Sequence, residues 1–185
     1  MDSIIITVVC CVLVADFITG VVHWTEDTYG LPSWPFLGGF VIEPNIEHHL
    51  RPTLLGTMSN LALRNYQAVV PLGVVSAAAV WWFGWSAWPF ALTLSLASVG
   101  NEVHTWNHRR SNNAAIRFLQ DAGIVQSPRQ HAKHHRAPFD KYFCTLTNIT
   151  NEALELVQFW RRLEWLILVV FRIAPKRMSP ERLGV

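Results

Sequence analysis

Eight histidines fall in four tight groups along this chain of 185 residues. The densest group is His131, His134 and His135, spaced i, i+3 and i+4 behind Ser127 and the proline that follows it. Serine favours a helix N-cap and proline favours the first helical position, so we predict a short helix from Ser127, ended by Pro138. The spacing would place all three imidazoles on one helical face, an arrangement suited to binding metal through neutral ring nitrogens.

The remaining five histidines are a single residue, His23, the adjacent pair His48 and His49, and a pair one helical turn apart, His104 and His108. An adjacent pair points two ways on a helix or strand. It can serve two ions, or one ion and a contact behind another ligand. A single zinc site takes three or four protein ligands, so eight histidines exceed one site and indicate two metal ions. Surface or hydrogen-bonding histidines remain the alternative for any single group.

Carboxylates accompany the histidines. In the first apolar segment, Asp16, Gly20, His23 and Asp27 lie at i, i+4, i+7 and i+11, which is one stripe of a helix. An aspartate in a spanning helix is energetically unfavourable and marks function, and metal-bound histidines commonly donate their second N–H to a carboxylate. A hydrated Asp16 at the membrane interface and a plain surface role for the carboxylate at 121 stay open as alternatives. We expect four carboxylates to orient histidines or bridge metals: Asp16, Asp27, Glu47 and Asp121.

The composition indicates a membrane protein, because 51% of residues are hydrophobic and only 15% are charged, against roughly 25% in soluble domains. We predict an all-α integral membrane protein with a histidine-rich di-metal helical cap on one side. Three segments are expected to cross the bilayer: Ile4–Val22, Ala68–Phe83 and Phe90–His104. The first is not expected to be a cleaved signal peptide, because no positive residue precedes it and no small-residue cleavage site follows.

The cations predict the orientation. The three predicted spans and the Gly84–Pro89 turn carry no lysine or arginine, whereas thirteen cations follow the third span, from Arg109 to Arg182. By the positive-inside rule the N-terminus lies outside and the histidine groups lie on the cytoplasmic side, in a bacterial inner membrane or an equivalent internal membrane. A net charge of +2 gives no argument for nucleic acid, and the cations are better explained by topology and anionic lipid.

The segments between and after the predicted spans are expected to lie at the membrane surface or outside the bilayer. The Pro- and Gly-rich stretch Leu31–Asn65 is expected to be re-entrant or interfacial and to bring residues 47–49 beneath the spans. The stretch Asn151–Ile173 is predicted to be one amphipathic interfacial helix. Residues 1–175 would form a single domain, followed by a loose polar tail at 176–185. Cys144 is expected to be a packed thiol, since no base is spaced to activate it.

The ligand set favours redox chemistry on lipid. Imidazole-rich sites suit iron, copper and zinc, but the His-Glu-x-x-His pattern of zinc proteases is missing. Two irons held by neutral nitrogens would suit O2 activation and attack on an unactivated C–H bond, within reach of a lipid chain. A membrane metal transporter would place histidines along a mid-bilayer path, and a haem protein needs only single histidines on facing helices.

The chain resembles the plasmanylethanolamine desaturase family, which includes the plant chloroplast phosphatidylglycerol trans-desaturase. The motifs that carry the resemblance extend from Asp16 to about Glu164. They are Asp16-Phe17…Gly20…His23-Trp24…Asp27, Glu47-His48-His49…Pro52, Asn101…His104…Trp106…His108, Leu119-Gln120-Asp121, His131…His134-His135…Pro138, Tyr142…Cys144 and Phe159–Glu164. Met58–Ala62 departs from the ether-lipid branch, which usually carries a further histidine and acidic residues there, and Ser59–Leu61 looks more like the plant branch.

The resemblance implies a membrane lipid desaturase with two iron ions, O2 as co-substrate and an external electron donor such as a cytochrome b5- or ferredoxin-like protein. It implies a double bond placed near the headgroup of a phospholipid chain, as a vinyl ether in the animal and bacterial members and as a trans acyl bond in the plant member. The eight histidines would form the metal site, most as direct ligands and one or two as hydrogen-bond partners of the ligands. Phosphate contact is expected from five cations, with plain topology charge as the alternative: Arg129, Lys133, Arg136, Arg161 and Arg162.

Overall fold

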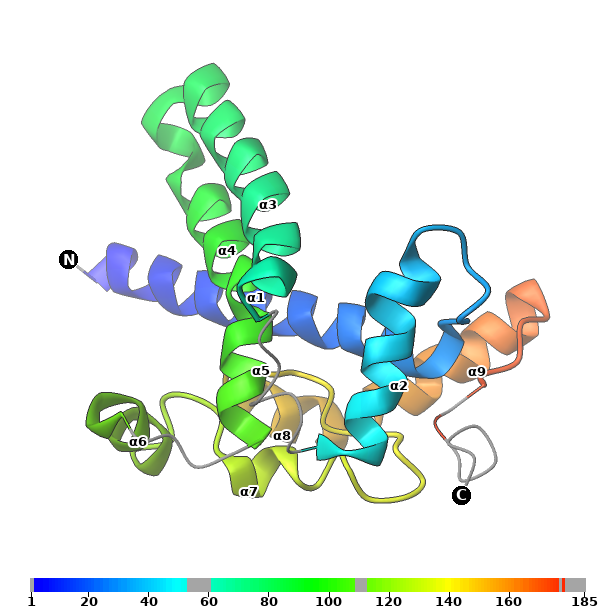
Figure 1. Cartoon of the computed structure of the whole chain (residues 1–185). Coiled ribbons are helices and arrows are strands. Elements are labelled where there is room, and N and C mark those ends of the chain that lie inside the picture. Colours follow the sequence, from blue (N-terminus) through cyan, green and yellow to red (C-terminus); the bar gives the residue numbers. More distant parts are fainter. Residues whose placement is uncertain (1, 53–60, 109–112, 177, 179–185) are drawn as a thin grey trace.

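The computed structural model describes residues 2–52, 61–108, 113–176 and 178, and its regular elements over these residues are helices, as predicted. In chain order they are α1 (Asp2–Tyr29), the π-helical turn η1 (Gly38–Ile42), α2 (Glu43–Leu50), α3 (Leu61–Phe83), the 3-10 turn η3 (Gly84–Ala87), α4 (Trp88–Ser98), α5 (Gly100–His108), α6 (Ala114–Asp121), α7 (Pro128–His131), α8 (Ile149–Leu156) and α9 (Phe159–Phe171) (Figure 1).

Two helical stretches of the described chain are long and apolar enough to cross a membrane: Asp2–Tyr29 and Ala68–His108. The second stretch is a hairpin in which α3 and α4 lie side by side, joined by η3 (Figure 1). Large apolar side chains on both stretches are exposed, including Ile6 on α1 and Trp81 at the end of α3. The third predicted helix is interrupted at Val99 and runs on to His108, so it consists of α4 and α5.

Helix α1 packs against α4 and crosses it at an angle (Figure 1). Near the hairpin turn, Cys11 Sγ lies 3.3 Å from the carbonyl oxygen of Pro89. Further along, a Cβ at Gly100 would lie 2.5 Å from the methyl carbon of Thr19, so the glycine permits this close approach. The N-terminal half of α1 and η3 therefore lie toward one end of the molecule, and the histidine-bearing parts of α1 and α5 lie toward the other.

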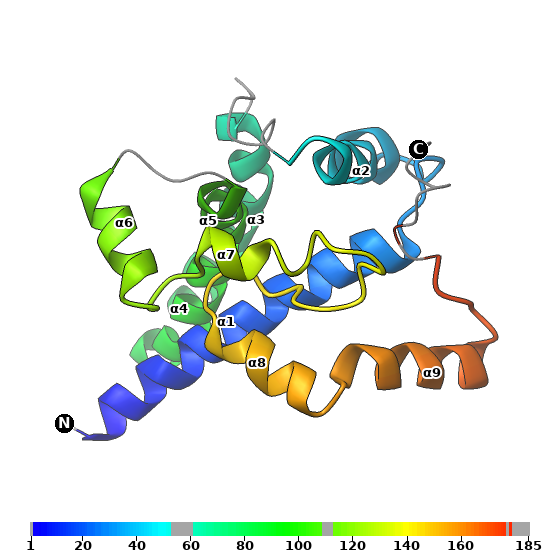
Figure 2. The same cartoon turned by 90° about the horizontal axis from the view of Figure 1, so that it is seen from below.

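The buried extended segment 143–147 crosses α1 one turn before His23 (Figure 2). Phe143 and Cys144 are fully buried and form a core cluster with Trp24 and Trp160. A Cβ at Gly20 would lie 2.5 Å from Cys144 Sγ, so glycine is required where this segment crosses the helix. Cys144 is a packed thiol, as expected.

The predicted C-terminal helix is two helices. The chain breaks after α8 at Gln158, whose φ of 52° lies in the left-handed region, and α9 then begins at Phe159. One face of α9 buries Trp160 and Glu164, while its other side chains leave a broad apolar surface exposed, from Trp165 to Phe171. The tail beyond residue 176 lies largely outside the described residues, but Met178 is buried rather than loose.

Candidate metal centre

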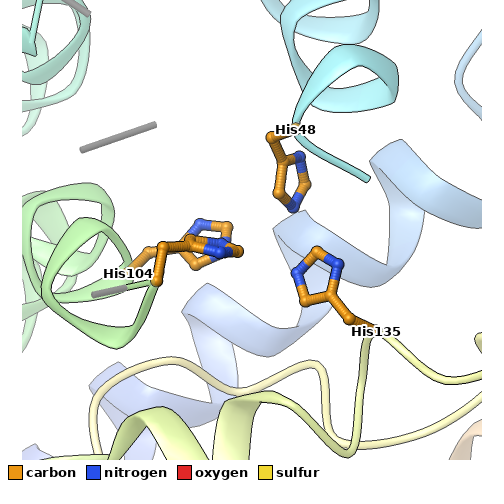
Figure 3. A group of neighbouring side chains, drawn as sticks. His48, His104 and His135 are labelled. Carbon is orange, nitrogen blue, oxygen red and sulfur yellow. The ribbon is translucent and has the colours of Figure 1, made fainter. Parts of the chain in front are cut away.

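All eight histidines converge beside the last turns of α1. They come from five places in the chain: α1 (His23), α2 (His48, His49), α5 (His104, His108), α7 (His131) and the turn after it (His134, His135). Contacting rings have centroids 4.3–6.3 Å apart. Figure 3 shows the rings of His48, His104 and His135 pointing toward one another from three separate segments.

The first group, called here the carboxylate group, consists of His23, Asp27, His49 and His134, whose ligand atoms all lie within 4.8 Å of one another. All four residues are buried. Oδ1 of Asp27 lies 3.1 Å from Nε2 of His49, and Oδ2 lies 3.1 Å from Nε2 of His134 and 3.6 Å from Nε2 of His23. A carboxylate thus faces three imidazole nitrogens in the buried interior.

Backbone carbonyls fix two of these rings. Nδ1 of His23 lies 3.0 Å from the oxygen of Phe143, and Nδ1 of His134 lies 2.9 Å from the oxygen of Lys141. A carbonyl only accepts, so each Nδ1 carries the proton and each neutral ring keeps a lone pair on Nε2. Those lone pairs face the carboxylate of Asp27, an arrangement that is repulsive unless a cation or an extra proton lies between them. The donor set fits a bound metal ion.

The second group, called here the imidazole group, consists of His48, His104, His108 and His135, again with ligand atoms within 4.8 Å of one another. His131 adjoins it. The Nε2 atoms of His104, His108 and His131 form a triangle with sides of 3.0, 3.0 and 3.1 Å. Each neutral nitrogen offers one proton or one lone pair, so three atoms cannot satisfy three such contacts by hydrogen bonding. A shared cation satisfies them.

His48 gives the clearest sign of an absent ligand. Its side chain is buried, and neither of its ring nitrogens has a hydrogen-bond partner among the described residues. A buried polar atom without a partner typically costs about 1–3 kcal/mol. Burial lowers the pKa of His48, and neighbouring imidazoles lower it further; the same causes lower the pKa of His131 and of His135. These rings are therefore neutral near pH 7, the state that binds metals.

Two expectations about the histidines are confirmed. The adjacent pair divides between the groups, with His48 in the imidazole group and His49 in the carboxylate group, while His104 and His108 share one group. The predicted start of α7 is also correct, since Ser127 Oγ accepts from the N–H of Gln130 at 3.3 Å.

The predicted extent of α7 is wrong, because the α-helix stops at His131 and single turns follow it. The His134 N–H, for example, bonds to the His131 oxygen at 2.9 Å. The trio therefore does not share one helical face: His135 belongs to the imidazole group and His131 adjoins it, while His134 lies against Asp27.

The structure separates the four predicted carboxylates. Asp27 lies in the carboxylate group. Asp16 lies elsewhere: it accepts from the N–H groups of Leu146 and Thr147 at 2.8 and 3.1 Å and from the Thr147 hydroxyl at 2.6 Å. It is fully buried, so it holds that backbone segment and is neither hydrated nor placed against a ring.

The other two carboxylates, Glu47 and Asp121, are outside both groups. Glu47 forms an exposed ion pair with Arg51 at 3.4 Å on α2. Asp121 is exposed at the end of α6. Neither carboxylate is therefore placed to orient a described imidazole.

Several polar residues around the centre were not predicted. Asn45 donates to Oδ1 of Asp27 at 2.6 Å, and its position one helical turn before His48 and His49 could have suggested it. Asn151 holds Cys144 by accepting from its N–H at 3.0 Å and donating to its carbonyl at 2.8 Å. Gln126 donates to the same carbonyl at 2.7 Å. No local pattern in the sequence reveals these long-range contacts.

The five predicted phosphate contacts also differ from one another. Lys133 pairs with Glu152 at 2.9 Å, and Arg161 pairs with Asp140 and Glu155 at 3.5 and 3.0 Å. These two cations are therefore engaged by carboxylates of the same chain. The remaining three are exposed: Arg129, Arg136 and Arg162.

A cavity of about 290 Å³, called here the metal cavity, reaches both groups. His23 and His104 form part of its wall, and α1, α3, α4, α5 and η1 surround it. Toward the hairpin its lining is apolar, with Ile18, Leu72 and Ala97, and toward α2 it includes polar side chains such as Asn45. The cavity can hold an extended apolar chain with one polar end beside the histidines.

Over its described residues the chain is helical, with two apolar stretches long enough to cross a membrane and two groups of residues that could hold metal ions. The chain belongs to the lipid desaturase domain family, whose model matches residues 12–178. It is 33% identical to plasmanylethanolamine desaturase 1 of Mus musculus over 89% of this chain and 65% of the relative. It is 29% identical to the plasmanylethanolamine desaturase of Myxococcus xanthus, over 89% of this chain and 60% of the relative.

A plant protein is similar at a comparable level. The chain is 28% identical to fatty acid desaturase 4, chloroplastic, of Arabidopsis thaliana, over 90% of this chain and 52% of that protein. The chain thus spans between about half and two thirds of the length of these relatives. No solved structure matches the chain.

Proposed function

We propose that the chain is an O2-dependent di-iron lipid desaturase that forms the vinyl-ether double bond of a plasmalogen from an alkyl-ether phospholipid. Three observations support this: membership of the lipid desaturase family, the two metal-ligating groups, and a cavity that runs past both. Two of the similar proteins are named as plasmanylethanolamine desaturases.

Each group supplies the ligands of one ion. His23, Asp27, His49 and His134 would hold one iron, and His48, His104, His108 and His135 the other, with His131 completing or orienting the second. Iron bound at both positions supplies activation of O2 and removal of hydrogen from an unactivated C–H bond. Asn45 keeps Asp27 oriented, and the carbonyls of Phe143 and Lys141 keep two rings turned inward.

The observation that carries the proposed position of the double bond is the change in polarity along the metal cavity. Its apolar part, between α1 and the hairpin, matches an alkyl chain, and its polar part, near Glu26, Asn45 and Asn101, matches a headgroup and glycerol. His23 and His104 lie on the same wall. The bonds held next to the metals are therefore those nearest to the headgroup.

We further propose the membrane arrangement expected from the sequence. The N-terminus would lie outside, α1 and the α3–α4 hairpin would cross the bilayer as three spans, and α9 would lie along the cytoplasmic surface. Two contacts support it: Cys11 lies beside Pro89 at the start of α4, and Thr19 lies beside Gly100 at the start of α5, so the histidine-bearing ends of α1 and α5 lie on one side. Electrons would come from a separate cytochrome b5- or ferredoxin-like protein.

Lipid profiling of a host membrane tests the proposal. Expression of the chain in a host that makes alkyl-ether phospholipids should yield phospholipids that release an aldehyde on mild acid treatment, and the His104→Ala variant should yield none. Unchanged lipids with wild-type protein that carries two irons would contradict the proposed substrate.

A second candidate is trans-desaturation of an acyl chain of phosphatidylglycerol, favoured by similarity to the Arabidopsis protein. It would leave the ether lipids unchanged and produce an acid-stable trans double bond, which gas chromatography of fatty-acid methyl esters detects. Residues 58–62 are the stretch that departs from the ether-lipid branch. Positions 58–60 lie outside the described residues, so this stretch gives no structural argument for either branch.

The class of metal protein can be tested on purified material. Metal analysis and an optical spectrum should give about two irons per chain without the Soret band of haem. A chain that transports metal would carry no redox pair. The convergence of histidines on one end of α1 and α5, rather than along a path through the helices, argues against transport.

A further inference from the structure

The two metal-ligating groups meet at one pair of rings. His23 of the carboxylate group and His104 of the imidazole group have ring centroids 4.8 Å apart. His23 is fixed from behind by the carbonyl of Phe143, which lies in the segment 143–147. His104 is carried by α5, so the separation of the groups depends on how α5 lies against that segment.

Gln126 lies between α5 and the segment. It stands in the loop between α6 and α7, and its side chain is fully buried. Its Nε2 donates to the carbonyl of Cys144 at 2.7 Å, and its Oε1 accepts from Nδ2 of Asn107 at 2.7 Å. Asn107 belongs to α5, directly before His108, whereas Cys144 directly follows Phe143. One amide therefore joins α5 to the segment behind both groups.

Backbone carbonyls fix the orientation of this amide. A carbonyl only accepts, so the atom of Gln126 that faces Cys144 is the nitrogen, and the oxygen is left to accept from Asn107. Nδ2 of Asn107 also donates to the carbonyl of Thr145, at 2.9 Å, which gives that side chain the matching orientation. Neither amide can turn over without losing a hydrogen bond, so the two form one connected network.

The backbone of Gln126 is held as well. Its N–H donates to the carbonyl of Leu146 at 2.8 Å, and its carbonyl accepts from Nε2 of Gln120 at 3.1 Å. The next residue, Ser127, caps α7, whose last residue is His131. The start of α7 is therefore tied to the same junction.

We propose that Gln126 is a positioning residue that sets the separation of the two metal-ligating groups by holding α5 against the segment that fixes His23. This rests on the proposed function, in which each group holds one iron. Asn151 provides a contrast, because its two hydrogen bonds to Cys144 tie the segment to α8, whose sequence contains no histidine. Gln126 should therefore act on both groups, and Asn151 on the carboxylate group alone.

The test replaces Gln126 with methionine, which keeps a side chain of similar length and removes both hydrogen bonds. We expect the variant to fold, because each partner keeps another bond. Cys144 still accepts from Asn151. Asn107 still donates to the segment, through the carbonyl of Thr145.

The measurements use the iron-loaded full chain in detergent. Without the link, α5 can move away from the segment, so X-ray absorption should show a longer iron–iron distance in Gln126→Met than in the wild type. Mössbauer spectra should show both iron environments altered. Both ions should be lost to a chelator about 10-fold more readily, at the lower end of the effect of residues that orient ligands.

Gln130→Met is the matched control. It removes a buried amide of the same type on α7, but that amide donates to Glu152 at 2.6 Å and does not join the two groups. It should leave the iron–iron distance and at least one iron environment unchanged. Asn107→Leu breaks the link from the side of α5, so it should reproduce Gln126→Met, and the double variant should add little to either.

The outcomes separate this proposal from the proposed function. An unchanged iron–iron distance in Gln126→Met, or alteration of only one iron environment, would overturn the positioning role and leave the proposed function intact. Wild-type protein without two irons would contradict the proposed function and this proposal with it. If Gln126→Met does not fold, as shown by loss of a cooperative thermal transition, Asn107→Leu decides by the same measurements.

Discussion

The two metal-ligating groups differ in charge, burial and support. The carboxylate group contains Asp27, is fully buried, and has two of its rings held by backbone carbonyls. The imidazole group has no carboxylate among its described members, and His108 and His135 are only partly buried. We propose that this difference divides the work between the groups: the carboxylate group would hold its ion permanently, and the imidazole group would leave room for exchange of a ligand.

The largest expected effect comes from Asp27→Asn. It removes the negative charge that faces three imidazoles, and it replaces one acceptor oxygen with a donor. We expect iron to fall from about two per chain to one or fewer, and product to fall by more than about 100-fold, beyond the 10–100-fold typical of residues that only orient a ligand. Iron analysis and product assay measure both. Glu47→Gln, on an exposed carboxylate of α2, should change neither.

A smaller effect is expected from His135→Ala. The imidazole group keeps His48, His104, His108 and the adjoining His131, so its ion should bind about 10–100-fold more weakly rather than be excluded. Titration with a chelator, followed by optical absorbance, measures this. The neighbouring exposed Arg136→Ala is the control. Equal losses for Asp27→Asn and His135→Ala would show that the two groups do not differ as proposed.

Asn151→Ala tests the support of the carboxylate group. The amide holds both backbone groups of Cys144, next to the carbonyl that fixes His23. Leaving these buried groups unpaired should cost about 1–3 kcal/mol of unfolding free energy and weaken iron binding by about 10-fold in the carboxylate group. Mössbauer spectra should show one iron environment altered and the other unchanged. Asn148→Ala, one turn earlier and half-buried, should have the smaller effect.

The pH dependence of metal-free protein follows from three largely buried rings in and beside the imidazole group. Burial lowers the pKa of His48, His131 and His135 below the value of about 6.5 expected in the unfolded chain. The unfolded chain therefore takes up more protons as the pH falls below about 6.5, and the folded state loses stability there but not above it. Thermal unfolding between pH 8 and pH 5 measures the slope, which His135→Ala should reduce. A flat profile would contradict neutral rings.

The smallest effect is expected from Lys133→Met. Partial desolvation lowers the pKa of Lys133, but hydrogen bonds to Glu152 and Tyr142 outweigh it and leave the pKa raised. The pair is largely exposed, so its loss should change the unfolding free energy by less than about 1 kcal/mol and leave iron content unchanged. Loss of iron would show that this surface pair holds α7 in place.

The two groups also differ in how far local spacing in the sequence predicts their members. Spacing along one helix is local, so the shared group of His104 and His108 and the division between His48 and His49 could be foreseen. The helix start at Ser127 could be foreseen for the same reason. The grouping of His134 with Asp27 could not, because it depends on turns after α7 that carry no strong propensity.

Hydrogen bonds between distant segments of the chain could not be predicted from local spacing either. The sequence marks Asp16 because an aspartate in a spanning helix is unfavourable, and it predicts histidine partners, but the partners are backbone N–H groups of Leu146 and Thr147, more than a hundred residues away. Asn151 is similarly invisible, since its role depends on the path of residues 143–147. Only the folded chain shows that these side chains supply the hydrogen bonds that a helix or sheet would otherwise give to the backbone of residues 143–147.

The adjacency of His48 and His49 has a consequence for how the centre is filled. The two rings share one turn of α2 yet belong to different groups, so, with one ion in each group as proposed, the first ion to bind would restrict the backbone that presents the other ring. The second ion then orders fewer bonds and binds more tightly, which is positive cooperativity through shared conformational entropy. Metallation should therefore proceed in nearly one step, and chains with a single iron should stay scarce at half loading.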